Sequence, residues 1–125
     1  METGIKGRKE IVVAPEQSAR HAGSGLVDVF ATPAMVALME GTASDSVLPY
    51  LEEGQGTVGI ALNITHDAAT PIGMKVWCES ELIKVEGRKL TFKVEVFDEK
   101  ERVGGGTHER FIITTEKFQA RVNAK

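Results

Sequence analysis

Glu40 is the first of three polar side chains that interrupt apolar segments and are able to carry chemistry. It is the only charged residue between Pro33 and Thr42, and its neighbours one helical turn away, Val36 and Ala43, are apolar. An ionised carboxylate on such a face is costly unless it is paired or reaches water. The pattern leaves two interpretations: a solvated residue on a partly exposed helix, or a carboxylate in a cleft that acts as a base or nucleophile.

His66 and Thr32 are the other two candidates. His66 ends an alternating strand pattern just before the break at Ala69-Thr70-Pro71, and sites are often built where strands meet loops. The same pattern also fits a histidine satisfied within the core, so both interpretations stay open. Thr32 precedes Pro33, which is typical of a helix N-cap followed by proline. A hydroxyl there lies beside free N–H groups that favour developing negative charge.

One helix and about five strands are expected to position these side chains. Apolar residues occupy most sides of the segment 33–51, which predicts a buried helix. A strand is predicted over Lys9 to Val13, and the weakly patterned segment 16–29 reads as a loop or mobile flap. The final ten residues are basic and are expected to form a solvated tail.

The second half of the chain has strand periodicity. Residues 57–66 alternate so that one face is predicted to carry Val58, Ile60, Leu62, Ile64 and His66. Segments 75–85 and 89–97 are joined by Glu86-Gly87-Arg88, a hairpin signal. Segment 106–115 is predicted to be a further strand with His108, Arg110 and Ile112 on one side. One long helix against one antiparallel sheet gives a two-layer α+β domain.

Composition limits the function classes. The 125 residues suit a single domain over 1–125. A net charge of -3 does not favour nucleic-acid binding, and no apolar run is long enough to span a membrane. The N-terminus lacks the apolar core of a signal peptide, and the one cysteine, Cys78, suits a reducing cytoplasm. We assign Cys78 to packing. The spacing of the three histidines does not favour a metal site.

Five short motifs carry a resemblance to a known family. They are VFAT at 29–32, LME at 38–40, THDAATP at 65–71, VEGR at 85–88 and GTHERF at 106–111. With them the chain resembles the hotdog-fold acyl-CoA thioesterases, in particular the fluoroacetyl-CoA thioesterase group. The resemblance runs over nearly the whole chain and implies the hotdog fold, in which one long central helix is wrapped by an antiparallel sheet.

The resemblance also implies an activity and a site. The expected reaction is hydrolysis of an acyl-CoA to a carboxylic acid and free CoA, with Thr32, Glu40 and His66 as catalytic residues. Gly59 and Arg110 fall on positions that contact the substrate in the family. No metal or redox cofactor is implied, and CoA enters as part of the substrate. Family members form homodimers, or higher homo-oligomers, with sites at the interface, so Glu40 and His66 can come from one protomer or from different protomers.

One segment departs from the family pattern. The fluoroacetyl-specific relative has a longer, aromatic-rich lid where this chain has only AGSGLVD at 22–28. Catalysis is therefore expected to carry over without fluoroacetyl selectivity. Three other functions remain open at this point: a non-catalytic acyl-CoA binding module, a hotdog hydratase or dehydratase, and a structural dimer module.

Overall fold

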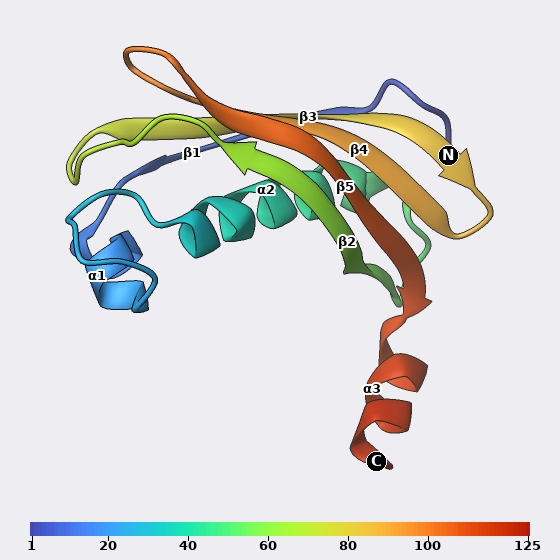
Figure 1. The fold of residues 1–125 in the computed structure, drawn as a ribbon. Helices are drawn as coiled ribbons and strands as arrows, with labels where there is room; N and C mark the ends of the chain where they lie inside the picture. Colours follow the sequence, from blue (N-terminus) through green and yellow to red (C-terminus); the bar gives the residue numbers. More distant parts are fainter.

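A five-stranded antiparallel sheet curves around one long helix in a computed structural model that describes all 125 residues (Figure 1). The strand order across the sheet is β1-β3-β4-β5-β2. The strands are β1 (Lys6–Val12), β2 (Gln55–His66), β3 (Lys75–Glu86), β4 (Lys89–Asp98) and β5 (Arg102–Thr114). The helices are α1 (Ala19–Ala22), α2 (Thr32–Val47) and α3 (Thr115–Asn123). This confirms the predicted α+β arrangement and the hairpin between the third and fourth strands.

The core lies between α2 and the concave face of β1, β3 and β4. From α2, Met35, Met39 and Val47 are fully buried against strand residues such as Val94 and Phe92. Full burial of one such side chain contributes about 1.5–3 kcal/mol. The helix α2 packs mainly against β1 and β3. It therefore covers the β2 side of the concave face less.

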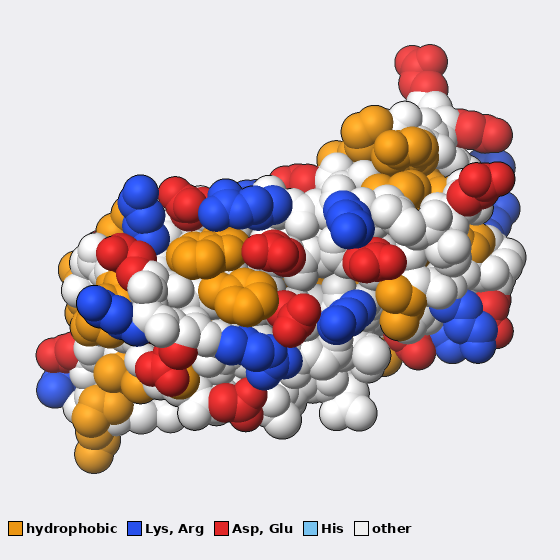
Figure 2. Space-filling model, turned by 90° about the horizontal axis from the view of Figure 1, so that it is seen from above, with side chains coloured by type: hydrophobic (Ala, Val, Ile, Leu, Met, Phe, Trp, Pro, Cys, Tyr) orange, Lys and Arg blue, Asp and Glu red, His pale blue; other side chains and the backbone are white.

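The opposite, convex face of the sheet carries charges of both signs. Figure 2 shows Lys and Arg side chains alternating with Asp and Glu around a few hydrophobic groups. Trp77 stacks on Phe97 there, and the Arg8 guanidinium lies 5.4 Å from the Trp77 ring centroid. Several of the charges pair at the surface, including Lys75 with Glu10. This face is therefore a solvated one with no concentrated charge of either sign.

A β-bulge at Ile60 overturns part of the predicted strand pattern. β2 pairs with β5 up to Gly59 and again from Ala61, which leaves Ile60 without a partner. Paired residues of antiparallel strands share a face, so one unpaired residue reverses the alternation. The prediction that Val58 lies on the face of His66 is therefore wrong. Gly59 takes that face instead, and Ile60 is 51% exposed.

The ends of the helices also differ from the predictions. Ala31, not Thr32, is the N-cap of α2, and no side chain caps this end. Thr32 is the first helical residue, so its hydroxyl is free for another contact. The C-terminal segment forms the helix α3 rather than a tail, although none of its residues is buried. The segment 16–29 is only partly a loop, because it contains the single turn α1.

Candidate functional site

Glu40 and Arg110 form an ion pair on the concave side of the sheet. Arg110 Nη1 donates to Glu40 Oε2 across 3.4 Å; the Arg110 side chain is 8% exposed and that of Glu40 is 44% exposed. Burial lowers the pKa of Arg110, while the Glu40 charge acts in the opposite direction. An arginine remains cationic despite such a shift. Glu40 is thus a paired carboxylate in a partly shielded position and not a freely solvated one.

Thr57 and His108 hold the Arg110 guanidinium in place. Arg110 Nε donates to Thr57 Oγ1 at 2.7 Å and Nη2 donates to the Thr57 carbonyl at 2.9 Å. Nη1 also lies 3.2 Å from His108 Nε2, and His108 Nδ1 lies 2.9 Å from the Ala61 carbonyl. A guanidinium only donates and a carbonyl only accepts, so His108 is neutral with its proton on Nδ1. Burial lowers the His108 pKa, which agrees with the neutral ring.

Gly59 provides the space that the Glu40 carboxylate occupies. In the register of β2 and β5, Gly59 lies opposite Arg110. A Cβ atom at Gly59 would lie 2.5 Å from Glu40 Oε2, 3.2 Å from His108 Cε1 and 3.3 Å from Arg110 Nη1. Any other residue at this position would therefore push against the carboxylate. Glycine here keeps Glu40 beside Arg110.

Thr32 and His66 form a second polar pair. Thr32 Oγ1 lies 2.8 Å from His66 Nδ1, and the buried ring of Phe30 meets the imidazole edge to face with centroids 6.3 Å apart. Burial lowers the His66 pKa, which favours the neutral ring near pH 7. The other ring nitrogen, Nε2, is buried and has no hydrogen-bond partner within the chain. A buried polar atom without a hydrogen-bond partner is rare.

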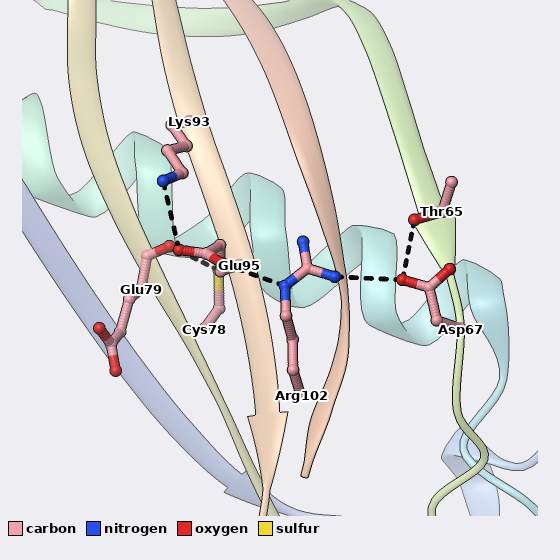
Figure 3. A network of polar contacts seen from close by, with 7 residues as sticks. All are labelled: Thr65, Asp67, Cys78, Glu79, Lys93, Glu95 and Arg102. Atoms are coloured by element: carbon pink, nitrogen blue, oxygen red, sulfur yellow. Dashed lines mark hydrogen bonds and ion pairs between the residues drawn. The ribbon is translucent and has the colours of Figure 1, made fainter.

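The chain is held firmly where it leaves His66. The Asp67 and Ala68 N–H groups both donate to the Val103 carbonyl, at 2.7 and 3.1 Å. Arg102 bridges Asp67 and Glu95, with N–O distances of 3.1 and 3.0 Å, so that the network joins β4, β5 and the end of β2 (Figure 3). Exposed ion pairs contribute little each. The two backbone hydrogen bonds with this network nevertheless fix the point at which His66 leaves the sheet.

The two polar pairs open into separate cavities of one protomer. Glu40, Gly59 and His108 line a cavity of about 190 Å³ against the free edge of β2. Thr32, His66 and Phe30 line another, of about 530 Å³, beside the start of α2. The structure thus brings Thr32 to His66 and Arg110 with Gly59 to Glu40. It does not bring Glu40 to His66 within one chain.

Sequence reasoning missed three contributors to these pairs. Phe30, Thr57 and His108 contact His66 or Arg110 directly, but they interrupt no pattern in the sequence. For His108 a signal was present, because it shares a predicted strand face with Arg110. The contacts of Thr57 depend on the register of two strands more than fifty residues apart, and no local pattern reports that register.

Comparisons with known proteins decide the family. The family model described as fluoroacetyl-CoA-specific thioesterase matches residues 13–116. The fluoroacetyl-CoA thioesterase of Streptantibioticus cattleyicolor is 41% identical, over 100% of this chain and 94% of that protein. The chain belongs to this family. It is accordingly an acyl-CoA thioesterase, and membership does not favour a binding module or a hydratase.

Solved structures confirm the hotdog fold. A structure of the fluoroacetyl-CoA thioesterase FlK superimposes with a TM-score of 0.95, at 41% identity over 100% of this chain and 97% of that one. A thioesterase superfamily member from Thermus thermophilus gives 0.90 at 30% identity, covering 98% and 91% of the two chains. A hot-dog-like protein from Thermanaerovibrio acidaminovorans, at 22% identity, covers 98% and 90% with a TM-score of 0.88 and supports the fold alone.

Three further observations concern membrane spans, metal-binding groups and the single cysteine. No helix of the chain combines the length and apolar character needed to cross a bilayer. No group of three or more His, Cys, Asp or Glu side chains is arranged to hold a metal ion. Cys78 is fully buried, as expected for a packing residue, and burial raises the pKa of its thiol to about 11. Such a thiol is not a ready nucleophile near neutral pH.

Proposed function

We propose that the enzyme hydrolyses acyl-CoA thioesters at a site completed in a homodimer, with Glu40 from one protomer and Thr32 and His66 from its partner. The observation that carries this proposal is the division of the polar residues between two cavities. One cavity holds the carboxylate, and the other holds a histidine whose buried Nε2 lacks a partner. Two copies arranged about a two-fold axis would complete two identical sites.

The free edge of β2 favours the required dimer. This strand has a hydrogen-bonded neighbour on only one side and is twelve residues long. Long exposed edges readily pair with another chain. Ile60 and Ala61 are exposed along it, and both line the cavity that contains Glu40. Pairing of two β2 strands would form one continuous sheet per dimer and bring the two cavities toward each other.

Glu40 supplies the base or the nucleophile in this mechanism. Its Oε2 faces Arg110, while Oε1 makes no hydrogen bond within the chain. In one route Oε1 takes a proton from water as the water oxygen attacks the thioester carbon. In the other, Oε1 attacks that carbon directly, the C–S bond breaks, and water then hydrolyses the mixed anhydride. Arg110 compensates the charge of Glu40 and keeps the carboxylate in position.

His66 and the start of α2 serve the leaving group and the oxyanion. In the water route, His66 accepts at Nε2 the proton that Glu40 took from water and passes it to the departing thiolate, so the ring ends neutral, with Nδ1–H held by Thr32 Oγ1. The free N–H groups at the N-terminus of α2, or the Gly59 N–H, would face the carbonyl oxygen. Losing one oxyanion donor typically costs about 2.7–4 kcal/mol. This route uses no metal or redox cofactor, and the buried thiol of Cys78 suits a reducing cytoplasm.

A substrate panel with matched variants tests the proposal. Purified enzyme is assayed against short, branched and aromatic acyl-CoAs with a free-thiol readout. Glu40→Gln should lower kcat on the best substrate by about 10²–10⁴-fold, because the amide keeps the shape and loses the base. Glu53→Gln, at an exposed loop position, is the control and should retain wild-type kcat. Near-native turnover by Glu40→Gln would refute the assigned role.

A further inference from the structure

The hairpin of β4 and β5 holds the chain that follows His66 at two points. At the first point, the Val103 carbonyl accepts from the first two N–H groups after His66, at 2.7 and 3.1 Å. At the second, the Asp98 carboxylate accepts from the Thr70 hydroxyl, with 2.8 Å between Oδ2 and Oγ1. Figure 1 shows the turn of this hairpin and the chain after β2 at the same end of the sheet. The segment 67–70 is therefore fixed at both of its ends by one hairpin.

Asp98 is a buried acceptor that the hairpin itself keeps in place. The residue is 5% exposed, and Thr70 is fully buried. Its other oxygen, Oδ1, accepts from the Lys100 and Glu101 N–H groups at 2.8 and 3.0 Å. Burial alone would raise the Asp98 pKa, but these hydrogen bonds and that from Thr70 lower it below the usual value. An ionised carboxylate only accepts, so the Thr70 hydroxyl is the donor and its direction is fixed.

Thr70 also holds the chain that leads into α2. Its carbonyl accepts from the Phe30 N–H at 2.8 Å. The Phe30 ring packs edge to face on His66, and two residues later the Thr32 hydroxyl lies 2.8 Å from His66 Nδ1. Thr70 is thus tied to His66 through the segment 67–70 and to Thr32 through Phe30. Its position sets how the two members of this polar pair meet.

We propose that Thr70 and Asp98 are positioning residues for thioester hydrolysis, which hold Thr32 in contact with His66; the inference rests on the active site proposed at that pair. Neither Thr70 nor Asp98 lines the cavity into which His66 opens, so both act through other residues. Without the hydrogen bond between them, the segment 67–70 loses one of its two anchors, and the start of α2 shifts relative to His66. A misplacement of about 1 Å in a catalytic group can cost about 10²-fold in rate.

Two substitutions of Thr70 separate positioning from stability. In Thr70→Val, which keeps the shape and loses the hydroxyl, kcat should fall about ten- to hundredfold. Its KM should stay within about twofold of wild type, because the contact it maintains acts in the transition state. Thr70→Ser keeps the hydroxyl and should retain kcat within about threefold. Ile5→Ala removes packing beside β1, at the opposite edge of the sheet from β2, and should lower stability without lowering kcat.

A double-mutant cycle shows whether Thr70 acts through Thr32. Thr32→Ala removes the contact with His66 that Thr70 is proposed to maintain. In that background Thr70→Val should lower kcat by less than about twofold, whereas independent effects would multiply. Asp98→Ala removes the same hydrogen bond from the acceptor side and should behave in the same way. Thermal unfolding of every variant shows that each is folded at the assay temperature, and Asp98→Ala replaces Thr70→Val if the latter is not.

The possible failures are distinct. Wild-type kcat in Thr70→Val and Asp98→Ala, with Thr32→Ala impaired, would overturn the positioning role and leave the active site in place. Losses that multiply in the cycle, or a loss in Thr70→Ser as large as that in Thr70→Val, would overturn it too. Near-native turnover by Thr32→Ala and by His66→Ala would instead refute the active site itself.

Discussion

At the scale of single residues, the position of the Glu40 carboxylate depends on the missing side chain of Gly59 as much as on the side chains around it. Arg110 holds the carboxylate, Thr57 and His108 hold Arg110, and Gly59 leaves the space. The resemblance assigned Gly59 to substrate contact. A Cβ atom at this position would lie nearest to the Glu40 carboxylate. Gly59 therefore has a second role, which is to leave room for that carboxylate.

Gly59→Ala should lower kcat while leaving the fold nearly intact. The new Cβ would lie 2.5 Å from Glu40 Oε2, and the flexible carboxylate would move aside at small cost in stability. A displacement near 1 Å in a catalytic group can cost about 10²-fold in rate. Steady-state kinetics and thermal unfolding on the same preparation measure both effects, with Gly25→Ala as the control because its Cβ would meet only Ala19, at 3.4 Å. A kcat within twofold of wild type would show that Glu40 does not need the room left by Gly59.

At the scale of elements, the strand β2 links the fold to the site. The alternation of residues 57–66 predicted a strand, but no local pattern could predict the bulge at Ile60, which depends on pairing with β5. The same dependence on register hid the contact of Arg110 with Thr57. Glu40 and His66 were predictable because each interrupts an apolar segment. The start of α2 was misjudged by one residue, which is within the usual uncertainty of helix ends. The helix α3 was missed because it buries no residue, so burial left no mark on its sequence.

Ile60→Arg should weaken the dimer and lower activity at low protein concentration. The change brings like charges from both protomers into the proposed β2 seam, which costs several kcal/mol. Ile83→Arg is a matched control, because Ile83 also lies at a bulge but on the interior strand β3, and it is 45% exposed. Light scattering and activity against dilution measure the effect. Equal behaviour of the two variants would argue against a seam at β2.

The segment 22–28 should leave this enzyme without strong fluoroacetyl selectivity. Leu26 and Val27 are its only sizeable apolar residues, and they are 85% and 58% exposed, so they do not close the cavity beside His66. One methylene-sized difference is worth only about 1–3 kcal/mol even in a well-packed pocket. The expected result is comparable kcat/KM for fluoroacetyl-CoA and acetyl-CoA, or a preference for a larger acyl group. A preference for fluoroacetyl-CoA of several orders of magnitude would contradict this.

At the scale of the whole molecule, two histidines, the half-buried His66 and the buried His108, couple stability to pH. Burial lowers the pKa of both His66 and His108, so each takes up a proton more readily in the unfolded chain, where the reference value is about 6.5. Stability rises with pH wherever the unfolded state binds more protons. The lowered carboxyl pKa values of Glu95 and Asp98 act in a more acidic range.

The free energy of unfolding should therefore fall as the pH is lowered from 7 to about 5. The limiting slope is about 1.4 kcal/mol per pH unit for each histidine. Denaturant titrations at several pH values and one fixed protein concentration measure it, since dimer stability depends on concentration. His108→Gln should reduce the slope. A stability that is flat over this range, or that increases on acidification, would show that these rings protonate equally well in the folded protein.

The central claim is that Glu40 and His66 act together across a dimer interface, and complementation between two inactive chains tests it most directly. Glu40→Gln and His66→Ala chains, each inactive alone, are co-expressed with different tags, so that mixed dimers form. Each mixed dimer would contain one complete site and one site lacking both groups. Random pairing makes half of the dimers mixed, so the account predicts recovery of about a quarter of the wild-type activity. A mixture as inactive as its parents, with mixed dimers demonstrated by tandem affinity purification, would contradict it.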